Sequence, residues 1–192
     1  MSPGQKPLPL KALFAAVGVL CVLVAMGLVL KLVLPARQKQ REERERRGLQ
    51  YACQSNLQRA FELAHDALDK HATVTADFSA LGFEPAPNNR YLYVVAATPT
   101  GLRRADPKFG LVNGDGLGVI AEVVDIGVSG TCPKCDLTIA CAGNLDTDDT
   151  LDVWSISTGD RVGPTGLIPK GIPFNHVDDV TNHRLPERVG PP

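Results

Sequence analysis

A long apolar segment near the N-terminal end places the strongest constraint on this chain. Residues 12–34 read ALFAAVGVLCVLVAMGLVLKLVL, and Lys31 is the single charged side chain among them. A helix needs roughly 20 apolar residues to cross a bilayer, whereas the apolar core of a cleavable signal peptide has about 7–15. A helix buried in a soluble core normally keeps a polar face, which this segment lacks. The sequence therefore predicts a short N-terminal segment, residues 1–11, followed by one transmembrane helix, residues 12–34.

A dense run of charged residues, PARQKQREERERR, follows the apolar segment. In this run Glu42 precedes Arg46 by four positions, and Glu43 precedes Arg47 by four. Because that order of charges supports a helix, we expect a charged juxtamembrane helix over residues 35–48. Its surface is either simply solvated or binds lipid phosphates through its basic side chains. Membrane lipid is therefore an expected partner.

From residue 49 onward, apolar residues recur every three or four positions, which places them on one side of a helix. This stripe comprises Leu49, Cys53, Leu57, Ala60, Phe61, Ala64 and Leu68. We expect the helix to end near His71 and its stripe to be buried against the rest of a globular domain, residues 49–181. The remaining residues, 182–192, lack an apolar pattern and are expected to form a flexible tail.

Four short segments rich in β-branched and aromatic residues are bounded by Gly, Pro, Asn or Asp, which is typical of strands. They are RYLYVVAAT (90–98), GVIAEVVDIG (118–127), DLTIACA (136–142) and LDVWSIS (151–157). In the last segment the side chains alternate, so Val153 and Ser155 share one face and Trp154 and Ile156 the other. The sequence predicts an α+β fold, in which a long N-terminal helix packs against a small antiparallel sheet of about four strands.

The sequence does not favour catalysis or nucleic-acid binding. The glycine-rich NGDGLG, residues 113–118, has the wrong spacing for a dinucleotide fingerprint and is expected to be a turn. The four histidines form no metal-binding or catalytic pattern, and most are expected at the surface; they are His65, His71, His176 and His183. No G-x-S-x-G, P-loop or H-E-x-x-H motif occurs. The net charge of −1 gives no reason to expect a nucleic-acid partner. We therefore predict that the protein is not an enzyme.

Four segments resemble type IV pilins. They are CQSNLQRAF (53–61), DFSALGFEPAPNNRYLY (77–93), TCPKCDLTIACAGNLDTDDTLDVWSIS (131–157) and IPKGIPFNHVDDV (168–180). The resemblance implies a long helix, half of it in the membrane, that is clamped by a sheet. It also implies a structural, fimbrial protein that contacts other pilin-like, pilus or secretion-system subunits. A pseudopilin of a secretion apparatus is the alternative within this class.

The N-terminal end differs from the pilin pattern. In pilins a glycine marks the processing site, and Phe-Thr-Leu-Ile-Glu follows it; the glutamate neutralises a neighbouring N-terminus during assembly. Here Gly4 is followed by QKPLPLKALF, and no glutamate lies before or within the apolar segment. We therefore expect a pilin-like protein with a degenerate signature, and both processing and polymerisation stay open.

The orientation in the membrane has two competing indications. Lys6 and Lys11 precede the apolar segment, whereas a larger basic group lies near or after its end: Lys31, Arg37, Lys39, Arg41, Arg44, Arg46 and Arg47. The positive-inside rule alone would place the globular domain in the cytoplasm. The resemblance implies the opposite, a single-pass protein of the bacterial inner membrane with its domain in the periplasm or outside the cell. We adopt that second orientation.

The cysteine pattern Cys132-Pro-Lys-Cys135 has three readings. A redox pair needs a lowered thiol pKa, usually at a helix N-terminus, but a strand is expected after Cys135. Structural zinc needs a second pair of ligands. Outside the cytoplasm the commonest fate is a disulfide. We therefore favour a Cys132–Cys135 disulfide, with Cys53 and Cys141 as a second candidate pair, over a membrane-tethered thiol or metal-binding protein.

An acidic loop follows the cysteines and contains Asn144, Asp146, Asp148, Asp149 and Asp152. Oxygen ligands at alternating positions suit calcium, and pseudopilins are known for a calcium site in a comparable loop. However, Asp149 occupies the position of the glycine in an EF-hand-type loop, and no closing glutamate follows. The alternative is a turn in which these side chains bond backbone amides. We favour the turn and keep calcium bound by Asn144, Asp146, Asp148 and Asp152 as the alternative, the one candidate cofactor.

Overall fold

The computed structural model describes residues 10–106, 115–145, 150–180 and 183–184. The chain divides into two compact units, Met1–Glu45 and Arg46–Pro192.

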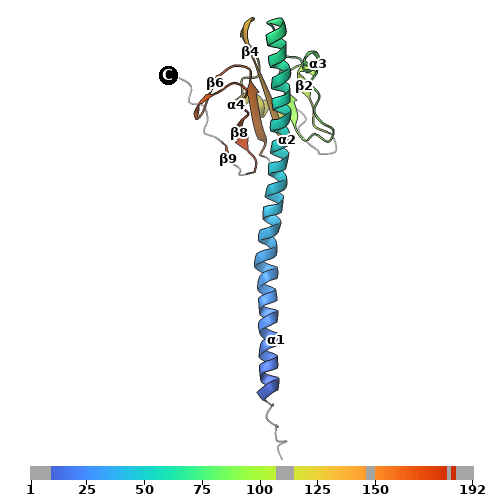
Figure 1. The fold of residues 1–192 in the computed structure, drawn as a ribbon, viewed down its shortest axis with the longest axis vertical. Helices are drawn as coiled ribbons and strands as arrows, with labels where there is room; N and C mark the ends of the chain where they lie inside the picture. Colours follow the sequence, from blue (N-terminus) through green and yellow to red (C-terminus); the bar gives the residue numbers. More distant parts are fainter. Residues whose placement is uncertain (1–9, 107–114, 146–149, 181–182, 185–192) are drawn as a thin grey trace, which may run out of the picture. The chain divides into compact units, whose positions relative to one another are not determined.

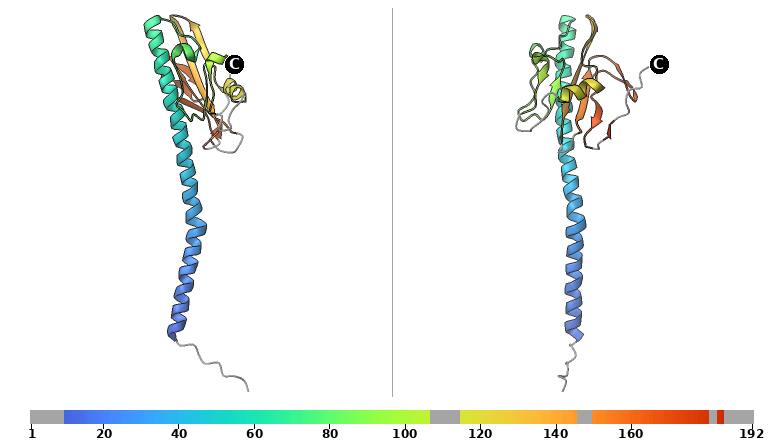
Figure 2. Two further views of the ribbon diagram at one scale, coloured as in Figure 1. Left: turned by 90° about the vertical axis from the view of Figure 1, so that its right-hand side faces the viewer. Right: turned by 180° about the vertical axis from the view of Figure 1, so that it is seen from behind.

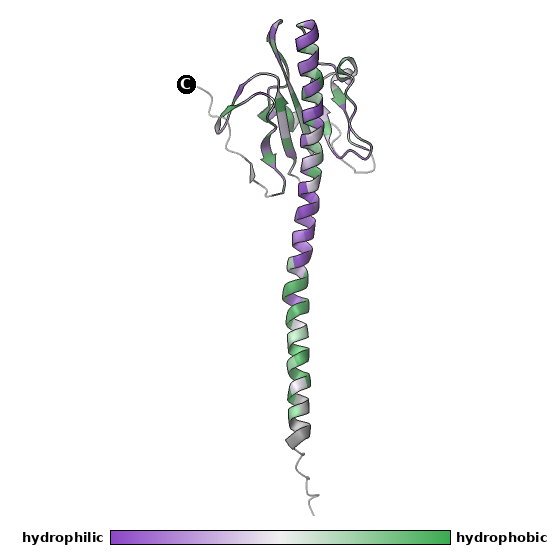
Figure 3. Ribbon diagram, in the orientation of Figure 1, coloured by the Kyte–Doolittle hydropathy of each residue, from purple (hydrophilic) through white to green (hydrophobic). Residues whose placement is uncertain are grey.

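The described part of the first unit, residues 10–45, is helical. It contains α1 (Leu10–Leu28), a π-helical turn η1 (Val29–Val33) and the beginning of α2 (Leu34–His71). The π-helical turn ends two residues before Pro35, which lacks the N–H group that an α-helix requires. The N–H of Leu34 bonds to the carbonyl of Val29. The apolar side chains of this unit are exposed, Phe14 at 68% and Leu32 at 66%, and Figure 3 shows the apolar stretch ending where α2 turns hydrophilic. The helix is long and apolar enough to cross a membrane, with none of its apolar window buried.

The second unit joins the remainder of α2 to a seven-stranded antiparallel sheet. The strand order is β2-β1-β4-β5-β8-β9. The seventh strand, β3, pairs with the first half of β4, on the edge whose second half pairs with β1. The strands are β1 (Leu92–Val94), β2 (Leu102–Arg103), β3 (Gly127–Thr131), β4 (Lys134–Gly143), β5 (Asp152–Ser157), β8 (Phe174–Asp178) and β9 (His183–Arg184). A separate hairpin consists of β6 (Arg161–Gly163) and β7 (Gly166–Ile168). The short helices are α3 (Phe78–Leu81), η2 (Pro99–Gly101) and α4 (Asp115–Val123).

The sheet is covered on both faces. Figure 1 shows the second half of α2 lying along the sheet, and Figure 2 shows α4 on the opposite side. The core on the α2 side includes Leu57 of the helix and Ile139 and Ile156 of β4 and β5. The core on the α4 side includes Ile120 of that helix and Val153 of β5. Central strands can therefore be apolar on both faces.

The predicted α+β architecture is confirmed, and so is most of the predicted stripe. Cys53, Leu57, Ala60 and Ala64 are fully buried, while the other three predicted members pack against this core in part: Leu49, Phe61 and Leu68. The alternation in β5 is also confirmed, because Trp154 and Ile156 belong to the α2 side and Val153 to the α4 side.

The predicted strand at residues 118–127 is wrong. Its first half is the helix α4, which also includes the last four residues of NGDGLG; Asn113 and Gly114 lie outside the described residues. The β-branched composition suggested a strand, but Leu117, Ile120 and Val124 recur at helical spacing and pack on the sheet. The sheet is larger than the four strands expected because β2, β3, β8 and β9 are too short or too polar to show a strand pattern.

Two smaller expectations change at the C-terminal end. His183 and Arg184 form β9, which pairs with β8, so these two residues are a strand rather than a flexible tail. The other tail residues, 181–182 and 185–192, lie outside the described residues. His176 is buried at 6% exposure, and its Nε2 lies 2.6 Å from the Oγ of Ser155, so it is not a surface histidine.

We predict that Leu57→Ala destabilises the second unit by about 2–5 kcal/mol, because it opens a cavity between α2 and the sheet. Tyr51→Ala, on the same helix but 71% exposed, should change stability by less than about 0.5 kcal/mol. Denaturant unfolding of the full chain in detergent measures both. Similar losses for the two variants would show that α2 does not form part of the core.

Candidate functional site

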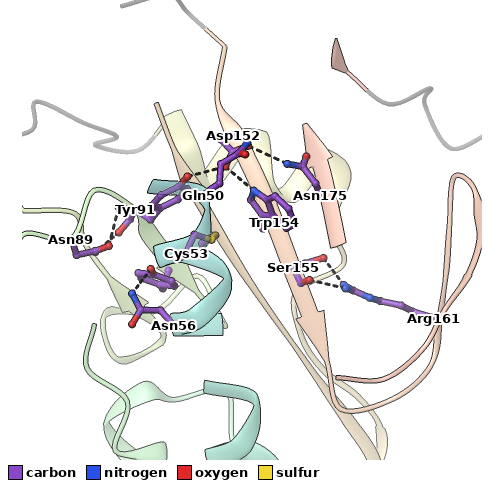
Figure 4. The surroundings of a disulfide bond; sticks show 12 residues. Gln50, Cys53, Asn56, Asn89, Tyr91, Asp152, Trp154, Ser155, Arg161 and Asn175 are labelled. Atoms are coloured by element: carbon purple, nitrogen blue, oxygen red, sulfur yellow. Dashed lines mark hydrogen bonds between the residues drawn. A yellow bond between two sulfur atoms is a disulfide. The ribbon is translucent and has the colours of Figure 1, made fainter. Parts of the chain in front are cut away.

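Three of the residues predicted as sites, Cys53, Cys141 and Asp152, lie where α2 meets the sheet, and Figure 4 shows the surroundings of Cys53 and Asp152. We call this region the clamp and define it by the Cys53–Cys141 disulfide and the hydrogen-bonded group around Asp152. The clamp is the candidate site of this chain, because it brings the largest group of buried polar contacts together with a disulfide.

Both predicted disulfides are present in the structure. Cys53 on α2 bonds to Cys141 on β4, across a sequence separation of 88. Cys132 bonds to Cys135, at a separation of 3, and closes the turn between β3 and β4. These four sulfurs are therefore not available as zinc ligands, and Cys135 lies in the core at 4% exposure. Cys21 in the apolar helix has a free thiol.

Asp152 is fully buried at the start of β5 and accepts four hydrogen bonds. Its Oδ1 accepts from Gln50 Nε2 at 2.9 Å and from Asn175 Nδ2 at 3.1 Å. Its Oδ2 accepts from the hydroxyl of Tyr91 at 2.8 Å and from Trp154 Nε1 at 2.7 Å. The donors come from α2, the segment before β1, β5 itself and β8, so one carboxylate connects the helix to three parts of the sheet.

Burial shifts the pKa values of Asp152 and Tyr91. It raises the pKa of Asp152, and the hydrogen bonds from Tyr91, Gln50, Trp154 and Asn175 act in the opposite direction. Burial also raises the pKa of Tyr91 far above its usual range, and the neighbouring Asp152 raises it further. The Tyr91 phenol therefore keeps its proton at neutral pH and acts as a donor.

The helix has two further polar links to the sheet region. Gln50 also donates to Asp178 Oδ1 at 2.9 Å, which in turn accepts from the backbone N–H of Val180 at 3.0 Å. Asn56, on the same helix, donates to the hydroxyl of Tyr93 at 2.8 Å. Together with the disulfide, these contacts fix both the position and the rotation of α2.

Of the four predicted calcium ligands, Asn144 and Asp152 lie among the described residues. Asp146, Asp148 and Asp149 lie outside them, and Asn144 is half-buried before that gap. Asp152 has two hydrogen bonds on each oxygen, so it serves as an acceptor within the clamp. Among the residues that the structure describes, no group of three or more His, Cys, Asp or Glu side chains could hold a metal ion. Calcium binding by Asn144, Asp146, Asp148 and Asp152 stays a prediction.

Sequence reasoning missed the donors of the clamp. Gln50 was detectable, because it lies three and seven positions before Cys53 and Leu57, on the apolar stripe, where a polar residue needs a partner. Tyr91 and Asn175 had no comparable signal, since their roles depend on strand pairing distant in sequence.

No protein-family model matches the chain, and a comparison with curated proteins finds no matching relative. The function is therefore inferred from the chain's own residues and their geometry.

We predict that removing Cys53–Cys141 is more costly than removing Cys132–Cys135. A disulfide stabilises by restricting the unfolded chain, and the restriction grows with the length of the closed loop. Replacing the first pair by serine should cost roughly 3–5 kcal/mol, and replacing the second about 2 kcal/mol or less. Denaturant unfolding of the two double variants checks this, and equal losses would contradict it.

We also predict that Asp152→Asn destabilises the clamp. The amide nitrogen would face two of the four donors, and each buried donor left without an acceptor costs about 1–3 kcal/mol. The matched control is Glu122→Gln, an exposed residue of α4, for which a change below about 0.5 kcal/mol is expected. Thermal unfolding followed by tryptophan fluorescence suits this test, because Trp154 lies beside the mutated residue. An Asp152→Asn variant as stable as the control would mean that the network contributes no net stability.

Proposed function

We propose that this chain is a structural, membrane-anchored, type IV pilin-like protein that acts through protein–protein contacts in or beside a pilus system. The proposal is carried by a long helical stretch with an exposed apolar part and a later part that is attached to the sheet. Its apolar part exposes large side chains and has none of its apolar window buried. Its later part is bonded covalently to a sheet through Cys53 and Cys141.

The clamp supports a mechanical role. A subunit that transmits or resists force through a helix must keep that helix on its own domain. The Cys53–Cys141 bond does so covalently. The hydrogen bond from Gln50 to Asp152 holds the adjacent turn of α2 in one rotation, and three donors outside the helix keep that carboxylate in place. The pilin resemblance of the segments that build this clamp points in the same direction.

Two disulfides also favour the outward orientation. Disulfides persist in oxidising compartments such as the periplasm and are rare in the cytoplasm. The globular unit contains both bonds, which favours the periplasm or the cell exterior for it over the orientation that the basic residues alone would give. The same pairing makes a tethered thiol or metal-binding protein the weaker hypothesis.

The anchor and its orientation are tested by fractionation of cells that produce the full chain. We expect the protein to remain in membranes after an alkaline carbonate wash. A Leu23→Lys, Val24→Lys variant should move toward the soluble fraction, since each central lysine costs about 2.5–3.5 kcal/mol of insertion free energy. Protease added to spheroplasts should digest the globular unit. A carbonate-soluble wild-type protein, or one protected from external protease, would contradict the proposal.

Shearing of intact cells then separates the two structural roles. Recovery in sheared filaments would assign the protein to the fibre itself. Retention in the membrane fraction would assign it to the machinery beside the fibre, in which case co-purification with other pilus subunits is expected.

A further inference from the structure

The charged residues that follow the apolar segment are basic before they are acidic. Arg37, Lys39 and Arg41 follow Leu34 by three, five and seven positions, and the first carboxylate is that of Glu42. At 1.5 Å per helical residue, these three basic residues lie about 5–10 Å beyond Leu34 along the axis of α2. The first two turns of the helix outside the apolar segment therefore carry only positive side-chain charge.

Three arginines share one side of this helix. Arg37, Arg41 and Arg44 follow the spacing i, i+4, i+7, which places them within about 60° of arc. Glu42 and Glu43 lie about 140° and 120° away from Arg37 around the axis. We call Arg37, Arg41 and Arg44 the basic face, and all three side chains are exposed.

The chain itself does not neutralise the basic face. Within the described residues, its three guanidinium groups form no ion pair, although Glu45 follows Arg41 by four positions. Like charges three or four positions apart on a helix repel one another. An anionic ligand with several oxygen acceptors would relieve this repulsion.

The direction of the side chains favours a ligand in the membrane surface. In an α-helix each Cα–Cβ bond tilts toward the helix N-terminus, so the arginines lean back toward the apolar segment. The headgroup layer on each side of the hydrocarbon core is about 5–8 Å thick, which brings the guanidinium groups of Arg37 and Arg41 into it. Arg44 stays within about one Debye length, ~8 Å, of its outer edge. Each guanidinium group can donate two parallel hydrogen bonds to phosphate oxygens.

We propose that the basic face binds the phosphate groups of anionic phospholipids in the leaflet from which α2 emerges. This rests on the proposed function, in which the residues up to Leu34 lie in the bilayer, and names a partner for the segment that follows. A zwitterionic headgroup carries an ammonium group that repels the arginines, so lipids with a net negative headgroup are preferred. Each basic residue near an anionic surface strengthens binding roughly fivefold.

The proposal also gives the basic residues after the apolar segment a role in the outward orientation. The positive-inside rule alone would place them in the cytoplasm. As ligands of anionic lipids, they stabilise the helix at the surface of whichever leaflet they reach. Their position after the apolar segment is then compatible with a globular unit outside the cytoplasm.

Native mass spectrometry of the full chain in detergent micelles tests the lipid contact. The protein is titrated with dioleoylphosphatidylglycerol or dioleoylphosphatidylcholine, which have the same acyl chains and differ in headgroup charge. We expect the wild-type chain to bind phosphatidylglycerol at least tenfold more tightly. Replacing Arg37→Gln and Arg41→Gln together should weaken phosphatidylglycerol binding at least tenfold and leave phosphatidylcholine binding unchanged.

The matched control replaces Arg46→Gln and Arg47→Gln. It removes the same charge from the same helix, but about 18–20 Å beyond Leu34, and should weaken phosphatidylglycerol binding less than threefold. Equal losses in the two double variants would mean that net charge alone attracts the lipid. That result, or equal binding of the two lipids by the wild-type chain, overturns the proposal.

Two further measurements separate the alternatives. Millimolar inorganic phosphate should not displace phosphatidylglycerol, because it lacks the acyl chains that keep a lipid beside the apolar segment; complete displacement would indicate a simple anion site and overturn the lipid assignment. The carbonate wash tests the anchor independently, since the apolar segment remains in the membrane whatever the headgroups are. A carbonate-resistant chain that does not prefer phosphatidylglycerol overturns this inference alone, whereas a carbonate-soluble chain overturns the proposed function.

Discussion

The attachment of α2 to the sheet is the interaction on which the rest of this structure depends. A covalent bond between Cys53 and Cys141 ties the helix to the central strand β4. One turn earlier, Gln50 reaches Asp152 on β5 and Asp178 on β8. Apolar burial of Leu57, Ala60 and Ala64 drives this packing, but burial alone tolerates a small rotation or slide of the helix. Directional bonds remove that freedom.

The polar groups of the clamp specify the fold more than they stabilise it. Burying a carboxylate costs free energy that its hydrogen bonds offset only when their geometry is good. The four donors around Asp152 satisfy both oxygens, and two of those donors, Tyr91 and Trp154, belong to the core that packs on α2. A helix in another register would leave this carboxylate buried without Gln50. The network therefore disfavours alternative packings, as buried polar groups do in some coiled coils.

How far the sequence could predict this structure depends on the range of the interactions. The apolar and amphipathic stretches of helix and the strands β4 and β5 were predictable because their patterns are local. α4 was misread, since a run of β-branched residues outweighed the helical spacing of Leu117, Ile120 and Val124. The bond from Gln50 to Asp152 spans 102 residues, and no local pattern contains it. The disulfides were predictable from the expected compartment, because cysteines outside the cytoplasm are usually oxidised.

The exposed side of α2 in the globular unit is the side of the helix that a partner could contact. The buried side is committed to the chain's own sheet through the disulfide and the Asp152 network, so it is not available to a partner. The opposite side carries Glu62, Asp66 and Asp69. Their carboxylates are exposed to water, and like charges at this helical spacing repel one another. Such a face offers a partner charge rather than apolar surface, and charge governs which partners and orientations are tolerated more than how tightly they bind. A rigidly clamped helix makes that discrimination effective, because a helix free to rotate would present its charges in many directions.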